Sequence, residues 1–172
     1  MAETRQFLRI GLMGVDYLLP SSTSYVIEKR EHLEINDAPG ALVAAWQATP
    51  TGRAPAYSVD ANLDPFSRHA WQRAVFIQAG RQTLGLVADE LELLSSEDLR
   101  VEPFIPPGPA PTPAGHLFGG AWVRAGQAPV LVFEPGALVF HPENVVIGRD
   151  VYVGHYAILK GYFKNTLTVG DG

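Results

Sequence analysis

Three features of this 172-residue chain predict an all-β fold. The chain contains 17 glycines and 14 prolines, and these 31 residues favour many short strands and turns over long helices. Apolar residues make up 47% of the chain and charged residues 18%, which is typical of a globular protein and not of a disordered one. Residues 73–95, RAVFIQAGRQTLGLVADELELLS, alternate with a period of two on both sides of a glycine, which indicates a β-hairpin.

This central hairpin is the clearest element of the sequence. Residues 79–82 supply its turn, because Gly80 can take a positive φ without a steric cost. Asp89 and Glu90 close the second strand, and their simplest interpretation is a solvated strand end. The apolar residues that alternate along the two strands are Val75, Ile77, Leu84, Leu86 and Ala88.

Further strands are expected on both sides of the central hairpin. In residues 25–33, charged helix formers compete with the β-branched pair Val26 and Ile27, and this pair favours a strand. A helical turn is predicted to start at Pro65 with Asp64 as its cap, and a second cap or polar turn at Ser95. The other strands are expected at 6–12, 17–19, 41–47, 56–59, 91–94, 119–124 and 129–133, with loops at 36–40, 49–55 and the proline-rich 103–113.

Composition excludes several classes of function. The net charge is −5 and no basic patch stands out, so nucleic-acid binding has no support. Cysteine is absent, which rules out disulfides and thiolate metal sites, and His69 has no second ligand four residues away. The residues up to about 140 contain no P-loop, no paired histidines and no nucleophile elbow. We therefore expect no cofactor, no metal, no catalytic residue and no enzymatic activity.

The chain also lacks the sequence features of export and membrane insertion. Its first ten residues, MAETRQFLRI, do not have the layout of a signal peptide, with charge followed by an apolar run. No apolar run approaches the roughly 20 residues that span a bilayer. The expected location is the cytoplasm, without membrane insertion.

Residues 1 to about 138 resemble the CheW-like domain, the adaptor module of bacterial chemosensory arrays. The resemblance rests on the run LGLVADEL at 84–91 and the closing strand PVLVF at 129–133. Near the N-terminus it rests on Gly14, Tyr17, Leu19 and Pro20. It implies two small β-barrel subdomains that share one core. It also implies a non-catalytic adaptor that couples a chemoreceptor tip to a CheA-type histidine kinase, through strand faces and the groove between the barrels.

One stretch departs from the family pattern. Where CheW-like domains carry an Asn-Leu-Arg-Gly motif before a proline-valine strand, residues 48–55 read ATPTGRAP, with Gly52 before Arg53. The arginine of that motif is implicated in partner binding. Arg53 either substitutes for it, or is only a loop arginine, or the surface has changed partner. A pilus- or motility-linked relative of CheW without kinase coupling also fits the displaced arginine.

The resemblance suggests where partners would bind. We expect contacts at Arg53, Tyr57 and Val59 on one barrel, and at Val87 and Asp89 on the other. Such contacts would be apolar and low in charge at their centre.

Residues 139–172 have a different sequence pattern. Ile147-Gly148, Val153-Gly154 and Leu159 follow at intervals of six, and Val169-Gly170 restarts the pattern after four extra residues. This spacing resembles the hexapeptide repeat of left-handed β-helix acyltransferases, in which each six-residue unit forms one side of a triangular coil. The tail is expected to form an incomplete, β-helix-like segment.

Several roles for this tail stay open. The alternative to the adaptor is a fragment or subunit of a hexapeptide-repeat acyltransferase with an N-terminal β domain. The repeat covers only about one and a half coils, and stacked coils need about three repeats to bury a core, so activity of this chain alone is not expected. The tail could instead be a truncated fusion, an assembly segment that promotes homo-oligomers, or ordinary strands.

Overall fold

The protein is built almost entirely from β-strands. The computed structural model describes residues 6–50, 52–60, 63–79, 82–103, 116–135, 145–147 and 167–169. Within these ranges it contains fourteen strands and two short 3-10 turns, and no α-helix. The predicted all-β class is confirmed. None of the described residues belongs to a helix that has the length and apolar character needed to cross a membrane.

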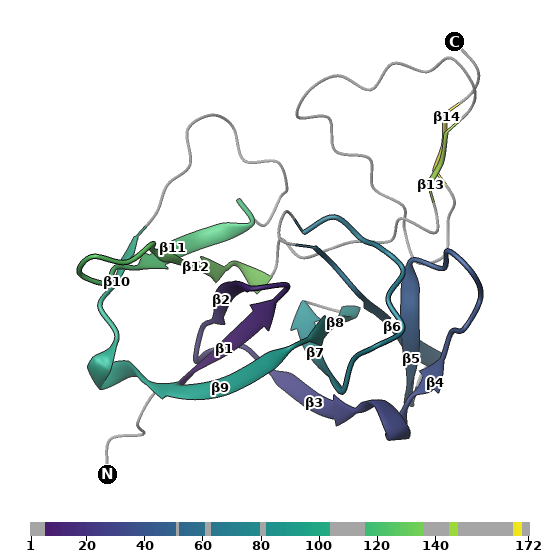
Figure 1. Cartoon of the computed structure of the whole chain (residues 1–172), viewed down its shortest axis with the longest axis horizontal. Helices are drawn as coiled ribbons and strands as arrows, with labels where there is room; N and C mark the ends of the chain where they lie inside the picture. Colours follow the sequence, from purple (N-terminus) through teal and green to yellow (C-terminus); the bar gives the residue numbers. More distant parts are fainter. Residues whose placement is uncertain are drawn as a thin grey trace. The chain divides into compact units, whose positions relative to one another are not determined.

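Two six-stranded sheets form the first part of the chain, and Figure 1 shows them on its left and right sides. Subdomain A has the strand order β10-β11-β12-β2-β1-β9. Its strands are β1 (Gln6–Leu12), β2 (Val15–Leu19), β9 (Glu90–Ser95), β10 (Val101–Pro103), β11 (Phe118–Trp122) and β12 (Val130–Phe133). Subdomain B has the order β3-β7-β8-β6-β5-β4. Its strands are β3 (Tyr25–Lys29), β4 (Glu34–Ile35), β5 (Val43–Thr49), β6 (Gly52–Tyr57), β7 (Arg73–Ala79) and β8 (Gln82–Ala88).

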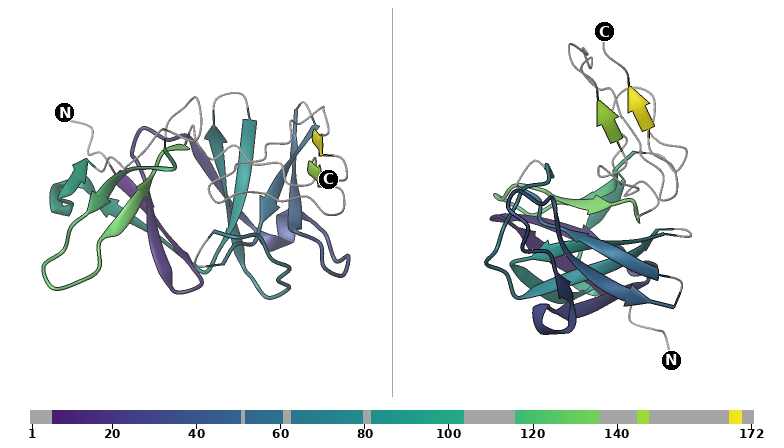
Figure 2. Two further views of the ribbon diagram at one scale, coloured as in Figure 1. Left: turned by 90° about the horizontal axis from the view of Figure 1, so that it is seen from above. Right: turned by 90° about the vertical axis from the view of Figure 1, so that its right-hand side faces the viewer.

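The two sheets have the same spatial order of strands, although the hairpin comes first in the chain in subdomain A and last in subdomain B. In each, an antiparallel three-stranded meander (β10-β11-β12 or β4-β5-β6) pairs in parallel with the second strand of a hairpin (β1-β2 or β7-β8). The two edge strands of each sheet are consecutive in the chain, joined by a 3-10 turn: η1 (Arg30–His32) between β3 and β4, and η2 (Ser96–Asp98) between β9 and β10. This short connection brings the edges of each sheet together and curls it towards a small barrel (Figure 2).

A shared apolar core joins the subdomains. Strand β1 contributes Leu8, Ile10 and Leu12, and strand β7 contributes Val75 and Ile77, all almost fully buried in the same cluster. Each subdomain also has its own smaller interior cluster: one around Leu18 and Val132 in A, and one around Trp71 and Phe76 in B. The predicted pair of subdomains with one common core is therefore confirmed.

The central hairpin forms as predicted, but it is buried on both faces. Strand β7 pairs with β8 from Arg73↔Ala88 to Ala79↔Gln82. Val75 faces the shared core, whereas its neighbour Phe76 faces the interior of subdomain B. Phe76 packs directly over Gly85, the residue opposite it on β8, because Gly85 has no side chain to obstruct the ring.

The predicted loop at 49–55 is wrong. Strands β5 and β6 form a tight hairpin there, with Thr49 opposite Gly52 and Gln47 opposite Ala54. Gly52 has a φ of +148°, in the region that favours glycine, so the chain reverses within a few residues. Strand β6 also pairs in parallel with β8, and this long-range pairing outweighs the turn-forming composition.

Three other local predictions have mixed outcomes. The segment 25–33 is a strand only to Lys29 and then forms the turn η1. No helical turn starts at Pro65, which instead forms an isolated bridge with Val59. The cap at Ser95 is confirmed, because its Oγ accepts a hydrogen bond from the Glu97 N–H at 3.3 Å.

The chain divides into two compact units, Met1–Leu138 and Val139–Gly172. In the second unit the described residues form two short strands, β13 (Val145–Ile147) and β14 (Leu167–Val169), which pair in parallel. The glycine turn at 80 and 81, most of the proline-rich loop and most of the six-residue repeats lie outside the described residues.

Candidate functional site

Asp89 lies where the chain passes from β8 of subdomain B to β9 of subdomain A. Its backbone N–H donates to the Gly11 carbonyl at 2.9 Å, and its Oδ2 accepts from the Met13 N–H at 2.8 Å. Its Oδ1 accepts a hydrogen bond and ion pair from Arg68. One carboxylate thus ties the β1–β2 turn to the connection that precedes β7. Asp89 is exposed and directly follows the end of β8, as predicted, but its carboxylate is bonded to Met13 and Arg68, which the prediction missed.

Electrostatics at Asp89 favour the charged form. The hydrogen bond from Arg68 lowers the pKa of the Asp89 carboxyl below its usual value. Partial burial opposes this effect, while the Met13 N–H and the positive charge of Arg68 add to it. Asp89 is therefore ionised at neutral pH. We call its contacts with Gly11, Met13 and Arg68 the Asp89 latch, and these contacts are intact at that pH.

A hollow of about 790 Å³ opens beside this latch, between η1 and the β8–β9 junction. Its lining combines charged and apolar side chains from both subdomains: Lys29, Arg30, Glu31, Leu33, Ile35, Trp71, Gln72, Arg73, Ala88, Asp89 and Leu91. A smaller hollow of about 320 Å³ shares Trp71, Gln72, Ala88 and Asp89 and adds Arg68, His69 and Ala70.

Arg30 and Trp71 shape one wall of the larger hollow. The Arg30 guanidinium lies 5.0 Å from the Trp71 ring centroid and donates to the His69 carbonyl. Its backbone N–H donates to the Gln72 carbonyl at 2.9 Å. These contacts hold the turn η1 against residues 69–72, so the wall is built before any partner arrives.

The strands that border this hollow also expose apolar side chains. Val26 and Ile27 are exposed on β3, the strand that ends at Lys29. Leu93 is exposed on β9, two residues beyond Leu91. Exposed apolar residues beside a hollow are typical of a surface that contacts another protein.

Arg53 is the one predicted contact residue with a largely exposed side chain, at 54%. It lies on β6, stacks over the Trp46 ring at 4.1 Å and forms an ion pair with Glu34 at 3.3 Å. The β5–β6 hairpin thus presents a flat arginine–tryptophan platform and not a flexible loop arginine.

Three of the predicted contact residues belong to the core. Tyr57, Val59 and Val87 are 1%, 6% and 2% exposed. Val87 was expected on the other barrel, but β8 belongs to the same sheet as β6, so this placement is wrong. Asp89 lies at the junction and not on either barrel alone. Because Tyr57, Val59 and Val87 are buried, they support the surface from beneath and do not form part of it.

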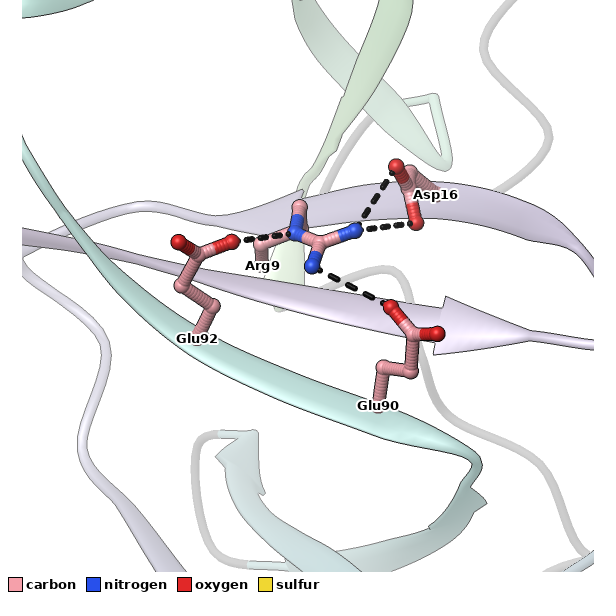
Figure 3. A network of polar contacts seen from close by, with 4 residues as sticks. All are labelled: Arg9, Asp16, Glu90 and Glu92. Atoms are coloured by element: carbon pink, nitrogen blue, oxygen red, sulfur yellow. Dashed lines mark hydrogen bonds and ion pairs between the residues drawn. The ribbon is translucent and has the colours of Figure 1, made fainter.

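A charged cluster in subdomain A was missed by the sequence reasoning (Figure 3). Arg9 donates from Nη1 to Asp16 at 3.1 Å, from Nη2 to Glu90 at 3.2 Å and from Nε to Glu92 at 2.9 Å. Burial alone would lower the pKa of the Arg9 guanidinium, but Asp16 and Glu92 outweigh it and raise that pKa. Arg9 is the one basic residue in 6–12, and Glu90 and Glu92 are spaced to share a strand face, which is the signal that could have indicated this cluster.

The described residues offer no site for a metal ion. No group of three or more histidine, aspartate or glutamate side chains converges within the part of the chain that the structure describes. What the described surface offers is a charged hollow at a subdomain junction, an arginine platform and exposed edge strands.

Comparison with known proteins agrees with this architecture. No family model matches the chain, and no curated protein matches it. Among solved structures, the crystal structure of the scaffolding protein TtCheW from Thermoanaerobacter tengcongensis is similar, with a TM-score of 0.51 at 15% sequence identity. The match covers 76% of this chain and 88% of that chain. The chain has the CheW-like fold.

Proposed function

We propose that this protein is a non-catalytic adaptor of a bacterial chemosensory system, acting in the cytoplasm and coupling a chemoreceptor tip to a CheA-type histidine kinase. The observation that carries the proposal is the similarity of fold to a scaffolding protein over 88% of that protein's length. The adaptor works by binding two partners at once, so it needs two separate surfaces and no reacting group.

The hollow at the subdomain junction is the proposed receptor surface. The strands β3 and β9, which contribute Lys29 and Leu91 to its lining, expose apolar side chains, and the contacts of Asp89 with Met13 and Arg68 join the two subdomains beside it. The buried residues Val87 and Trp71 belong to one cluster, so Val87 supports the wall of the hollow from beneath. A groove that is already built loses little entropy when it binds a partner.

The Arg53 platform is the proposed kinase surface. Its guanidinium is exposed, held flat by Trp46 and oriented by Glu34, and arginine is enriched where protein partners bind. Tyr57 lies further along β6 in the shared core, where it fixes the position of the strand that carries Arg53. Val59 belongs to the same core and supports this strand as well.

Binding of purified partners tests this proposal. The chain is immobilised and exposed to the CheA-type kinase and to a chemoreceptor signalling domain from the same genome. We expect saturable binding of both partners. The substitution Arg53→Glu is expected to weaken binding of the kinase and to leave binding of the receptor domain unchanged. Arg100→Glu is the matched control, because Arg100 is an exposed arginine that lines neither hollow. Absence of binding to either partner would contradict the coupling role, and binding to other scaffold proteins alone would favour the motility-linked relative.

The tail has its own candidate role as one coil of a hexapeptide-type β-helix. The parallel pair of β13 and β14 aligns Ile147 with Val169, which are 22 residues apart. This separation equals the three six-residue sides of one coil, 18 residues, plus the four-residue excess seen in the sequence. The pairing favours an assembly segment, and the acyltransferase subunit is the alternative that shares this architecture.

Mass in solution tests the tail. Light scattering compares the full chain with a version cut after Phe140. If the full chain is a trimer and the cut version is a monomer, the result supports assembly through the coils. If both versions are monomers, the result contradicts it.

A further inference from the structure

We propose that the hollow at the subdomain junction binds an acidic, amphipathic segment of a partner protein. Carboxylates of this segment would contact the cations of the hollow, and an apolar side chain would pack beside Trp71 and Leu91. The inference rests on the proposed adaptor function and goes further, because it assigns a chemistry to the segment that the junction surface selects.

The charge of the two adjoining hollows is opposite to that of the whole protein. Their linings contain four cations, Lys29, Arg30, Arg68 and Arg73, against two carboxylates, Glu31 and Asp89. The local balance is 4 − 2 = +2, whereas the chain as a whole carries −5. A positive hollow attracts the carboxylates of a partner locally, whereas the net negative charge of the whole chain opposes association between its copies.

Two of these cations face each other without adequate compensation. Lys29 and Arg73 lie directly opposite on β3 and β7, and like charges opposite each other destabilise a sheet. Lys29 has an ion pair with Glu31 at 3.5 Å, but both side chains are more than 60% exposed, so this pair contributes little. Arg73 forms no ion pair with any of the residues that the structure describes. A partner carboxylate between Lys29 and Arg73 would remove this repulsion.

The other two cations, Arg68 and Arg30, already contact residues of the protein itself. Arg68 is paired with Asp89, and Arg30 is stacked on Trp71 and bonded to the His69 carbonyl. They add to the positive potential but are held in place. The lining also includes the partly buried apolar residues Leu33, Ile35 and Leu91, which give a partner side chain an apolar surface. Charge at the rim with apolar lining below is the arrangement that an amphipathic segment matches.

A matched pair of synthetic peptides tests the inference. Both carry the same leucine and phenylalanine positions, and one has glutamate where the other has lysine. Binding of each labelled peptide to the full chain is measured by fluorescence anisotropy at low and high salt. We expect saturable binding of the glutamate peptide, weakened by salt, and at least about five-fold weaker binding of the lysine peptide.

Charge reversal locates the binding. Arg73→Glu is expected to lower the affinity for the glutamate peptide about five-fold, because an exposed attraction becomes a repulsion. The same substitution is expected to raise the affinity for the lysine peptide, because the repulsion becomes an attraction. Arg100→Glu makes the same change of charge outside both hollows, next to Glu102, and is expected to leave the ratio between the two peptides unchanged.

Several results would overturn the inference. They are equal affinity for the two peptides, no saturable binding of the glutamate peptide, the same effect from both arginine variants, or equally tight binding of a single-stranded oligonucleotide. Concentration-dependent dimers that Arg73→Glu abolishes would assign the hollow to a second copy of this chain instead. Failure of the adaptor function is distinguishable, because it appears as loss of binding to the purified kinase and receptor whatever the peptide preference.

Discussion

Replacing Gly85 with alanine tests how closely β6, β7 and β8 pack inside subdomain B. A Cβ at this position would lie 2.7 Å from the Ala56 Cβ, 2.7 Å from the Phe76 Cε1 and 2.8 Å from the Ala56 Cα. Ordinary carbon contacts lie at about 3.5–4.0 Å, so all three distances are too short. The added methyl group therefore requires two strands to move.

The atoms around Gly85 cannot move away from the added methyl group without a large energetic cost. Ala56 is paired with Gly85 in the parallel ladder between β6 and β8, so its Cα and Cβ move only with the backbone. Phe76 is 1% exposed and cannot turn towards solvent. Overpacking of a core costs typically about 1–3 kcal/mol, and we expect the upper end, about 3 kcal/mol. For a unit of this size that corresponds to a melting temperature lower by about 10 °C.

Urea unfolding followed by tryptophan fluorescence measures the loss. Gly119→Ala is the matched control, because the nearest atom to its added Cβ would be Glu134 Oε2 at 3.7 Å, an ordinary contact. This control is expected to change the free energy of unfolding by no more than about 0.5 kcal/mol or to stabilise slightly. Ala56→Gly combined with Gly85→Ala should cost less than the sum of the two single changes, by at least about 0.5 kcal/mol.

A Gly85→Ala protein with the urea midpoint of the wild type would refute this reasoning. So would additive single changes at positions 56 and 85. Either result would mean that the strands are not packed at the distances described.

Three further predictions concern titratable groups. Asp89→Asn should lower the free energy of unfolding by about 1–2 kcal/mol at about pH 7, because the charge facing Arg68 is lost. Since the folded pKa of Asp89 is lowered, its contribution is present above about pH 4 and is lost as the pH falls through the folded pKa. Wild type and variant should therefore converge in acid urea titrations, and a constant difference would contradict the latch. Arg9→Met should destabilise by about 1–2 kcal/mol at low salt and by less at high salt, since three carboxylates lose their cation; salt-independent unfolding would count against the cluster. Burial, with the charge of Asp60 adding to it, raises the pKa of Tyr17, so stability should fall above about pH 10. Tyr17→Phe should remove part of that alkaline loss in pH-dependent melting curves, and an unchanged profile would contradict it.

Local patterns predicted the hairpins and the cap. Strand alternation with a period of two and a glycine turn are properties of neighbouring residues, so 6–12, 73–79 and the Ser95 cap were readable. The segment 49–55 was misread because Gly52 and Pro55 signal a loop locally. What places them in a strand is the pairing of β6 with β8, about 30 residues away in the chain.

The contact residues were harder to predict than the strands. Alternation separates an inner from an outer face only where one face meets water, and β8 is buried on both. Val87 therefore looked like a surface position although it belongs to the core of subdomain B. Tyr57 was misjudged in the same way on β6.

The charged features depend on distant parts of the chain. Arg9 contacts Glu90 and Glu92, which are 81 and 83 residues away. The hollow combines residues from η1, the 68–73 connection and the β8–β9 junction. No spacing rule joins such segments, because only the sheet topology brings them together.

Receptor-dependent kinase activity tests the adaptor role most directly. Autophosphorylation of the CheA-type kinase is measured with the chemoreceptor signalling domain, with and without this protein, and with Arg53→Glu as the coupling-impaired variant. The proposed role predicts that the receptor changes kinase activity only when the wild-type protein is present, and that Arg53→Glu weakens this response. A receptor response of the same size without the protein, or no response with it although all three proteins are folded, would contradict the role as an adaptor.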